Sequence, residues 1–200
     1  MLLQILTYTH HLTTMLFGIF LSAFFLGVKQ NKKNVCILLS GAAVSGLFFL
    51  ICNTVFGSLF TEAVYPIFVH LPLFLLLVFY YRFRWLPSII SIMTAYLCCQ
   101  FSNWAGIFAL SLSGLEWVYY LVRIIVTVAV FAFLSRYLCQ TTALLFAKSD
   151  RELYILGAMP FVYYVFDYST TKYSMLLYSG NKVVVEFLAF AMCISYVIFL

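Results

Sequence analysis

Three ionisable residues interrupt long apolar runs and are the first candidates for chemistry. Arg123 lies in EWVYYLVRIIV, Asp167 in YYVFDYS and Glu186 in VVVEFLAF. An ionisable side chain near the centre of a bilayer costs roughly 2.5 to 3.5 kcal/mol on insertion scales, so it rarely persists without a partner or a role. At a helical rise of about 1.5 Å per residue, we expect all three to lie in the outer third of the membrane.

This shared depth suggests a binding site. We expect Arg123 to pair with Glu186 or Asp167 in a cavity that faces outward and binds a signal molecule. The alternative is a structural role, in which Arg123 extends toward the headgroups or forms an ion pair that holds the helices together. The expected lining of the cavity consists of tyrosines spaced around these charges: Tyr119, Tyr120, Tyr163, Tyr164 and Tyr168.

The histidines and cysteines lack the spacing of a catalytic or metal site. His10 and His11 are adjacent and His70 is isolated, so no pair stands four residues apart on one helical face to hold a metal. We interpret Cys98 and Cys99 as packing residues. No glycine-rich phosphate loop is present. We therefore expect no catalytic residue, no metal and no cofactor in these 200 residues.

Two further polar features fall inside apolar runs. The stretch CCQFSNW carries Gln100, Ser102 and Asn103, for which we favour hydrogen bonds between helices. Pro66 and Pro72 flank His70 and should kink the helix that contains them, because proline removes a backbone donor.

The composition identifies the environment of the chain. Hydrophobic residues make up 66% of the sequence and charged residues 8%, with a mean hydropathy of +1.08. A water-soluble domain could not cover its core with so little polar surface, so the chain is expected to be a polytopic protein of the cell membrane, surrounded by lipid. The net charge of +5 comes from short loops between apolar runs and indicates topology, not a nucleic-acid partner.

The apolar runs predict an all-α bundle of about seven transmembrane spans, each of roughly 20 residues. We place them at about 7–28, 35–56, 63–81, 86–110, 117–138, 152–170 and 183–200. Lysines follow the first span and none precedes it, which places the N-terminus outside and the C-terminus in the cytoplasm. Eight of the eleven cations then lie on the cytoplasmic side: Lys29, Lys32, Lys33, Arg82, Arg84, Arg136, Lys148 and Arg151.

Two four-residue patterns predict helix starts. SGLE, from Ser113 to Glu116, and SDRE, from Ser149 to Glu152, both fit the S-x-x-E capping box. In that motif the serine and glutamate side chains each accept a hydrogen bond from an otherwise unpaired backbone N–H. We expect these boxes to open the fifth and sixth spans.

The last quarter of the chain resembles a known family. Residues 151–200 read RELYILGAMPFVYYVFDYSTTKYSMLLYSGNKVVVEFLAFAMCISYVIFL, with Pro160 inside the sixth span, Asp167 before the outer loop and SGNK before an acidic last helix. The stretch looks like the end of the membrane region in sensor histidine kinases that carry a C-terminal GHKL ATPase domain, a group similar to peptide-pheromone receptor kinases of the AgrC type. The apolar run also reaches Leu200 without a polar flank, so we expect a longer parent chain.

The resemblance implies a signalling role for the chain. The last helix would continue into a cytoplasmic dimerisation helix, and an extracellular ligand such as a peptide would regulate autophosphorylation in a homodimer. ATP and Mg²⁺ would bind only to the kinase domain, which is absent from these residues and would act on a response regulator. The alternative is a substrate-binding membrane subunit of a transporter. An intramembrane enzyme would need a nucleophile or metal cluster that the sequence lacks.

Overall fold

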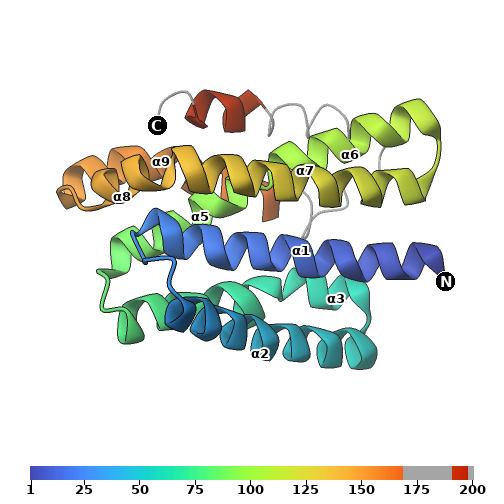
Figure 1. The fold of residues 1–200 in the computed structure, drawn as a ribbon, viewed down its shortest axis with the longest axis horizontal. Coiled ribbons are helices and arrows are strands. Elements are labelled where there is room, and N and C mark those ends of the chain that lie inside the picture. Colours follow the sequence, from blue (N-terminus) through green and yellow to red (C-terminus); the bar gives the residue numbers. More distant parts are fainter. Residues whose placement is uncertain (169–190, 198–200) are drawn as a thin grey trace.

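Every element that the structure describes is a helix. The computed structural model describes residues 1–168 and 191–197 of the chain (Figure 1). Within these ranges three helical segments are long and apolar enough to cross a membrane: Lys32–Phe56, Trp85–Ser113 and Glu116–Tyr137. The structure thus confirms an all-helical fold with membrane-helix character.

Most of the helices fall on the predicted ranges, and two short helices, at 58–63 and 139–146, were not predicted. In chain order they are α1 (Leu2–Phe25), α2 (Lys32–Phe56), α3 (Ser58–Ala63), η1 (Pro66–His70), α4 (Leu71–Leu75), η2 (Leu76–Tyr80), α5 (Trp85–Cys98), α6 (Gln100–Ser113), α7 (Glu116–Tyr137), α8 (Cys139–Phe146) and α9 (Asp150–Asp167). The first six predicted ranges all fall on helical segments. Of the seventh range only 191–197 is described, and it is helical.

Helix α1 forms the centre of the bundle. It packs against α7, α5, α8 and α2, and Figure 1 shows it between α7 and α2. Its C-terminal half is apolar and buried, from Met15 to Phe25, whereas its N-terminal half carries threonines and two histidines. In the N-terminal half His10 is buried, whereas Thr9 and His11 are exposed, so part of this polar stretch lies at the surface of the bundle.

The third predicted span changes helix type along its length. The elements η1 and η2 are π-helical turns, in which the N–H of Leu71 bonds the carbonyl of Pro66 and the N–H of Tyr81 bonds that of Leu76 at 3.1 Å. The first of these wide turns ends directly before Leu71 and Pro72, where proline lacks a backbone donor. The segment therefore departs from α-helical geometry at these two turns, and the kink expected at Pro66 and Pro72 stays a prediction.

The basic loops meet at one end of the bundle. Arg84 donates from Nη1 to Asp150 Oδ1 and from Nη2 to the carbonyl of Lys148, both at 2.7 Å. Tyr81 donates to Asn34 Oδ1 at 3.5 Å, and Asn34 donates to the carbonyl of Lys29 at 2.9 Å. The turns after α1, after η2 and before α9 thus lie together, and the N-terminus and the α6–α7 turn lie at the opposite end (Figure 1).

The two predicted capping boxes have different outcomes. Before α9, the Glu152 carboxylate accepts from the backbone N–H of Ser149 at 3.2 Å and from its hydroxyl at 3.0 Å, so this box is confirmed. The same hydrogen bonds hold the pKa of Glu152 below its usual value. At the other site the prediction is wrong, because Ser113 ends α6 and donates to the carbonyl of Ala109 at 2.7 Å.

The SGLE capping box does not form because of Gly114, the glycine between α6 and α7. Gly114 adopts a left-handed φ of 67° and closes α6, and Leu115 then occupies the N-cap of α7 without a side-chain cap. Glu116 is consequently the first residue of α7, where an acidic side chain favours the positive end of the helix dipole. A glycine in this conformation typically ends a helix, which leaves too short a turn for a capping box.

Helix α9 packs on α5 through a glycine. A Cβ atom added at Gly157 would lie 2.7 Å from both Cγ1 and Cδ1 of Ile90, well inside van der Waals contact. Gly157 therefore permits the close approach of two helices that are far apart in sequence, as small residues commonly do in membrane bundles.

We expect Gly157→Ala to lower the free energy of unfolding by about 1 to 3 kcal/mol, the usual cost of overpacking. Thermal unfolding of the protein in detergent micelles measures this change. Gly18→Ala is the matched control, because nothing lies within 4 Å of a Cβ at Gly18. In an Ile90→Ala background the Gly157 substitution should cost much less, and an equal cost in both backgrounds would disprove the contact.

Candidate functional site

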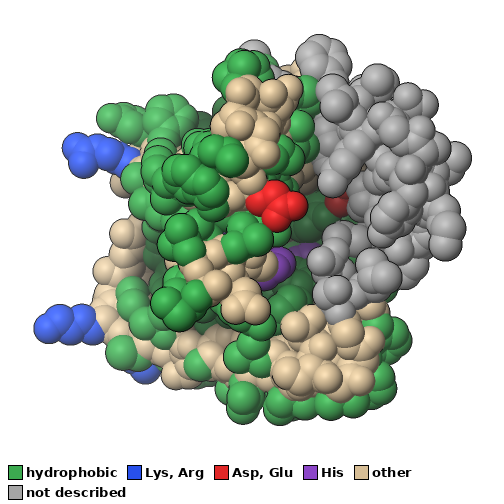
Figure 2. Space-filling view, turned by 90° about the vertical axis from the view of Figure 1, so that its right-hand side faces the viewer, with side chains coloured by type: hydrophobic (Ala, Val, Ile, Leu, Met, Phe, Trp, Pro, Cys, Tyr) green, Lys and Arg blue, Asp and Glu red, His purple; other side chains and the backbone are tan. Residues whose placement is uncertain are grey.

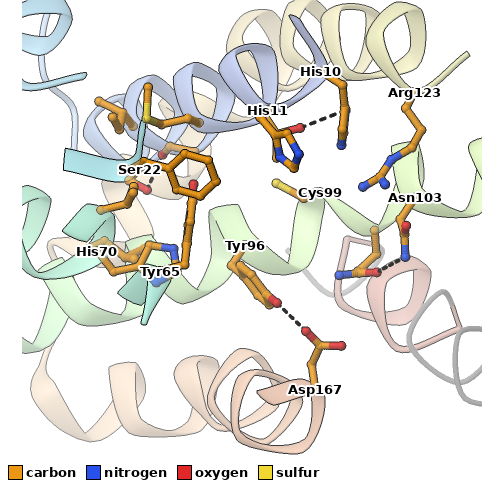
Figure 3. A pocket seen from close by; sticks show the side chains of 18 of the residues that line it. His10, His11, Ser22, Tyr65, His70, Tyr96, Cys99, Asn103, Arg123 and Asp167 are labelled. Carbon is orange, nitrogen blue, oxygen red and sulfur yellow. Dashed lines mark hydrogen bonds between the residues drawn. The ribbon is translucent and has the colours of Figure 1, made fainter. Parts of the chain in front are cut away.

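A polar cavity of about 520 Å³ lies inside the apolar bundle. Figure 2 looks at the end that holds the N-terminus and shows a hollow between hydrophobic side chains, with histidine visible inside it. Residues of α1, α2, α5, α6, α7, α9 and the π-helical segment line the cavity, and Figure 3 shows ten of them labelled. The predicted residues that line it are Arg123, Asp167, Tyr119, Tyr120 and Tyr168.

Arg123 enters the cavity from α7. Its Nη1 donates a hydrogen bond to the hydroxyl of Tyr119, one turn earlier, and its guanidinium carbon lies 5.0 Å from the centre of the Tyr119 ring. The Nε atom is buried and has no hydrogen-bond partner within the described part of the chain. Figure 3 shows the guanidinium directed into the cavity, between His10 and Asn103.

Gly106 of α6 provides the space for this side chain. A Cβ at Gly106 would lie 2.8 Å from Cδ of Arg123, still closer to its Cγ, and 3.1 Å from the ring of Tyr119. The aliphatic part of Arg123 therefore lies against the bare backbone of α6. Sequence reasoning missed Gly106, although an isolated glycine inside an apolar helix is a recognised sign of close approach.

The histidines of α1 form a second wall. His10 is buried, its Nδ1 lies 3.3 Å from Oγ1 of Thr14, and its ring centre is 5.9 Å from that of Tyr120. The ring of His11 is 5.4 Å from that of His10. The sequence analysis tested these two residues only for metal-ligand spacing and did not place them in the cavity.

Asp167 lies on the wall formed by α9 and α5. Its Oδ2 accepts a hydrogen bond from the hydroxyl of Tyr96, and Tyr168 follows it at the same wall. Tyr164 hydrogen-bonds His70 Nδ1 at 2.8 Å, which ties α9 to the π-helical segment. Tyrosine hydroxyls thus bond both Asp167 and His70 on this side of the cavity.

The predicted ion pair between Arg123 and Asp167 is not formed. Arg123 is held at the α6–α7 contact, whereas Asp167 is held by Tyr96 at the α5–α9 contact, and both face the same cavity. Of the other predicted site residues, Glu186 lies outside the described residues. Tyr163 packs beside Tyr96, with ring centres 6.2 Å apart, and like Tyr164 does not line the cavity.

The polar patch at the start of α6 also belongs to the cavity. Asn103 Nδ2 donates to Gln100 Oε1 at 3.3 Å, and both residues line the cavity wall. Among the described residues this pair bonds within one helix, and the expected hydrogen bonds between helices stay a prediction. Cys99, between α5 and α6, lines the cavity at the point where the two helices meet.

We expect Arg123→Met to raise the free energy of unfolding by about 1 kcal/mol, because a buried donor without a partner costs about 1 to 3 kcal/mol. Thermal unfolding in micelles provides the measurement. Arg136→Met removes an exposed arginine from the same helix and should change stability by no more than about 0.5 kcal/mol. A loss of stability on replacing Arg123 would instead establish the structural role.

Comparisons with known proteins provide no further assignment of the site. No family model matches the chain, and neither a curated protein nor a solved structure matches it. The chemistry of the cavity therefore follows from its own side chains, which among the described residues combine one guanidinium, one carboxylate, three histidines and several tyrosine hydroxyls.

Proposed function

We propose that the chain is the membrane-embedded sensor region of a histidine kinase with a GHKL-type ATPase domain, and that its cavity binds the signal. The observation that carries this proposal is the polar cavity itself, which holds charged and hydroxyl groups inside an apolar helical bundle. Such groups are costly in a membrane and are typical of functional sites.

The orientation of the bundle supports binding from outside the cell. The basic loops that contain Lys29, Arg84 and Lys148 lie at one end, and in the seven-span topology that end is cytoplasmic. The hollow seen in Figure 2 is at the opposite end, beside the N-terminus. A water-soluble signal in the outer medium would therefore reach the cavity without crossing the apolar layer.

Helix α5 offers a route from the cavity to the last helix. Tyr96 lies on the cavity face of α5, whereas Thr94 and Leu97 contact the helix at 191–197. Specifically, Cys193 Sγ donates to the carbonyl of Leu97 at 3.2 Å, and Tyr196 lies 3.4 Å from the hydroxyl of Thr94. A ligand that changes the position of α5 would thus move the helix that leads to the kinase domain.

The energetic requirement for such signalling is small. A ligand shifts an equilibrium only by its difference in affinity for the two arrangements, and a twofold shift needs about 0.4 kcal/mol. The interruption between α5 and α6 at Cys99 borders the cavity, so a ligand there contacts a place where the helix angle can change.

The remaining partners in this proposal follow from the kinase assignment. The working unit is a homodimer, ATP and Mg²⁺ bind to the cytoplasmic kinase domain, and a response regulator receives the phosphoryl group. The exposed apolar face of α2 contacts lipid or a second copy of the chain. Its residues include Val44, Leu47, Phe48 and Ile51.

Cysteine labelling tests whether the cavity is open to the outer medium. Gly18 lies in the C-terminal half of α1, lines the cavity and has open space beside it. In intact cells, Gly18→Cys should react with a membrane-impermeant methanethiosulfonate above the level of the parent chain. Val44→Cys, in the middle of α2 and exposed on its apolar face, should not react, because lipid excludes the reagent.

The side from which Gly18→Cys reacts distinguishes the two functions. A sensor cavity should react from outside only, whereas a transporter that alternates its access should also react in inside-out vesicles. Reaction from the inner side, or no reaction from either side, would contradict the proposed sensor.

A further inference from the structure

The positive charges of the described residues gather at one end of the bundle. Of the nine lysines and arginines in the described ranges, all except Arg123 lie at the end where α2 and α9 begin (Figure 1). We propose that part of this end is a binding surface for the headgroup of an anionic phospholipid. Such binding does not depend on the proposed sensor function. The surface consists of four cations: Lys29, Lys32, Lys33 and Arg82.

Two loops that contact each other carry these four cations. Asn34 Nδ2 donates to the carbonyl of Lys29 at 2.9 Å, and Asn34 Oδ1 accepts a hydrogen bond from the hydroxyl of Tyr81 at 3.5 Å. The other two lysines lie between Lys29 and Asn34, and Arg82 follows Tyr81 directly. All four cations are exposed, so this corner of the bundle presents a compact positive surface.

The carboxylates at this end are paired with other cations. Asp150 accepts a hydrogen bond from Arg84 at 2.7 Å, and Glu152 lies 3.7 Å from the ammonium of Lys148. These are the two ion pairs found among the described residues, and neither of them includes a cation of the surface. Its four charges therefore remain available to an anion from outside the chain.

Two features of the surface cost stability. Helix α2 begins at Lys32, so two lysines lie at the positive end of its dipole, and its first turn contains no acidic residue. A bound anion would offset this repulsion. Arg82 adopts a left-handed φ of 62°, which is unfavourable for a residue with a side chain and is found more often at binding sites than elsewhere.

The depth of the surface favours a phospholipid over a soluble anion. Tyr80 and Trp85 lie on either side of the loop that carries Arg82, and they are 48% and 57% exposed. Exposed tyrosine and tryptophan side chains are typical of the headgroup level of a membrane. The cations therefore lie close to the lipid phosphates. In the seven-span topology this end faces the cytoplasmic leaflet, which carries the anionic lipids that attract lysine and arginine.

Quenching of tryptophan fluorescence by brominated lipids tests the surface. Of the three tryptophans of the chain, Trp85 lies beside the surface, whereas Trp117 lies at the opposite end, next to Glu116. Two chains that retain only Trp85 or only Trp117 are made by exchanging the other tryptophans for phenylalanine. Each chain is reconstituted into phosphatidylcholine liposomes that contain the same small fraction of brominated phosphatidylglycerol or brominated phosphatidylcholine.

Brominated phosphatidylglycerol should be enriched around Trp85 by roughly threefold over brominated phosphatidylcholine, because the anionic headgroup is attracted to the four cations. Around Trp117 the two lipids should quench equally. Both leaflets of these liposomes have the same composition, so the result does not depend on the orientation of the protein.

Charge-matched variants distinguish a defined surface from general attraction to this end. In the Trp85 chain, Lys33→Gln combined with Arg82→Gln should lower quenching by the anionic lipid to the level of phosphatidylcholine. Arg136→Gln combined with Arg151→Gln removes two other exposed cations from the same end and should leave the enrichment unchanged. Lys33→Arg combined with Arg82→Lys keeps both charges and should also preserve it.

Three results would overturn the proposal. They are equal quenching of Trp85 by the two brominated lipids, an equal enrichment of the anionic lipid around Trp117, and an equal loss in the two pairs of glutamine variants. The last result would show diffuse attraction to the charge of the whole end. None of them would affect the sensor proposal, which the labelling of Gly18→Cys tests separately.

Discussion

The position of Arg123 is the constraint around which the bundle is organised. A permanently charged guanidinium must be kept inside an apolar bundle, and among the described residues it has no ion pair with a carboxylate. The structure achieves this with a glycine on α6 that receives the aliphatic part of the side chain and a tyrosine on α7 that binds one nitrogen. Its Nε is buried without a partner among the described residues, which costs stability, and functional sites often carry groups that folding alone would not favour.

The helices that form the other walls of the cavity also pack against the rest of the bundle. Helix α1 carries its histidines near the open end and its aromatic core residues at the other, so one helix serves both the site and the packing of the bundle. Helix α5 presents Tyr96 to the cavity and Leu97 to the helix at 191–197. Two neighbouring residues of α5 therefore link the cavity to the helix at 191–197.

How far the sequence predicts the site depends on the kind of information required. The depth of Arg123 and Asp167 follows from counting residues along each helix, and both residues do line one cavity. Arg123 and Asp167 do not pair directly, because the rotation of each helix is set by contacts such as those of Gly106 and Tyr96, which no count along one helix contains. The alternative pairing of Arg123 with Glu186 lies outside the described residues and stays a prediction. Similarly, the SDRE pattern forms a capping box, whereas the SGLE pattern does not, because its glycine, Gly114, adopts a left-handed conformation that ends α6.

The π-helical turns of the third segment have a consequence for how this protein can vary. A π-helical turn holds one residue more than an α-helical turn, so it is equivalent to a single inserted residue that the surrounding helix has absorbed. Loss of one residue within Pro66–His70 would convert the wide turn into an ordinary one and leave the helix on either side in its present rotation. Loss of a residue from an ordinary α-helical turn would instead rotate the chain beyond it by roughly 100°. The wide turns are thus the places in this cavity wall where the chain could lose a residue without turning the rest of the segment.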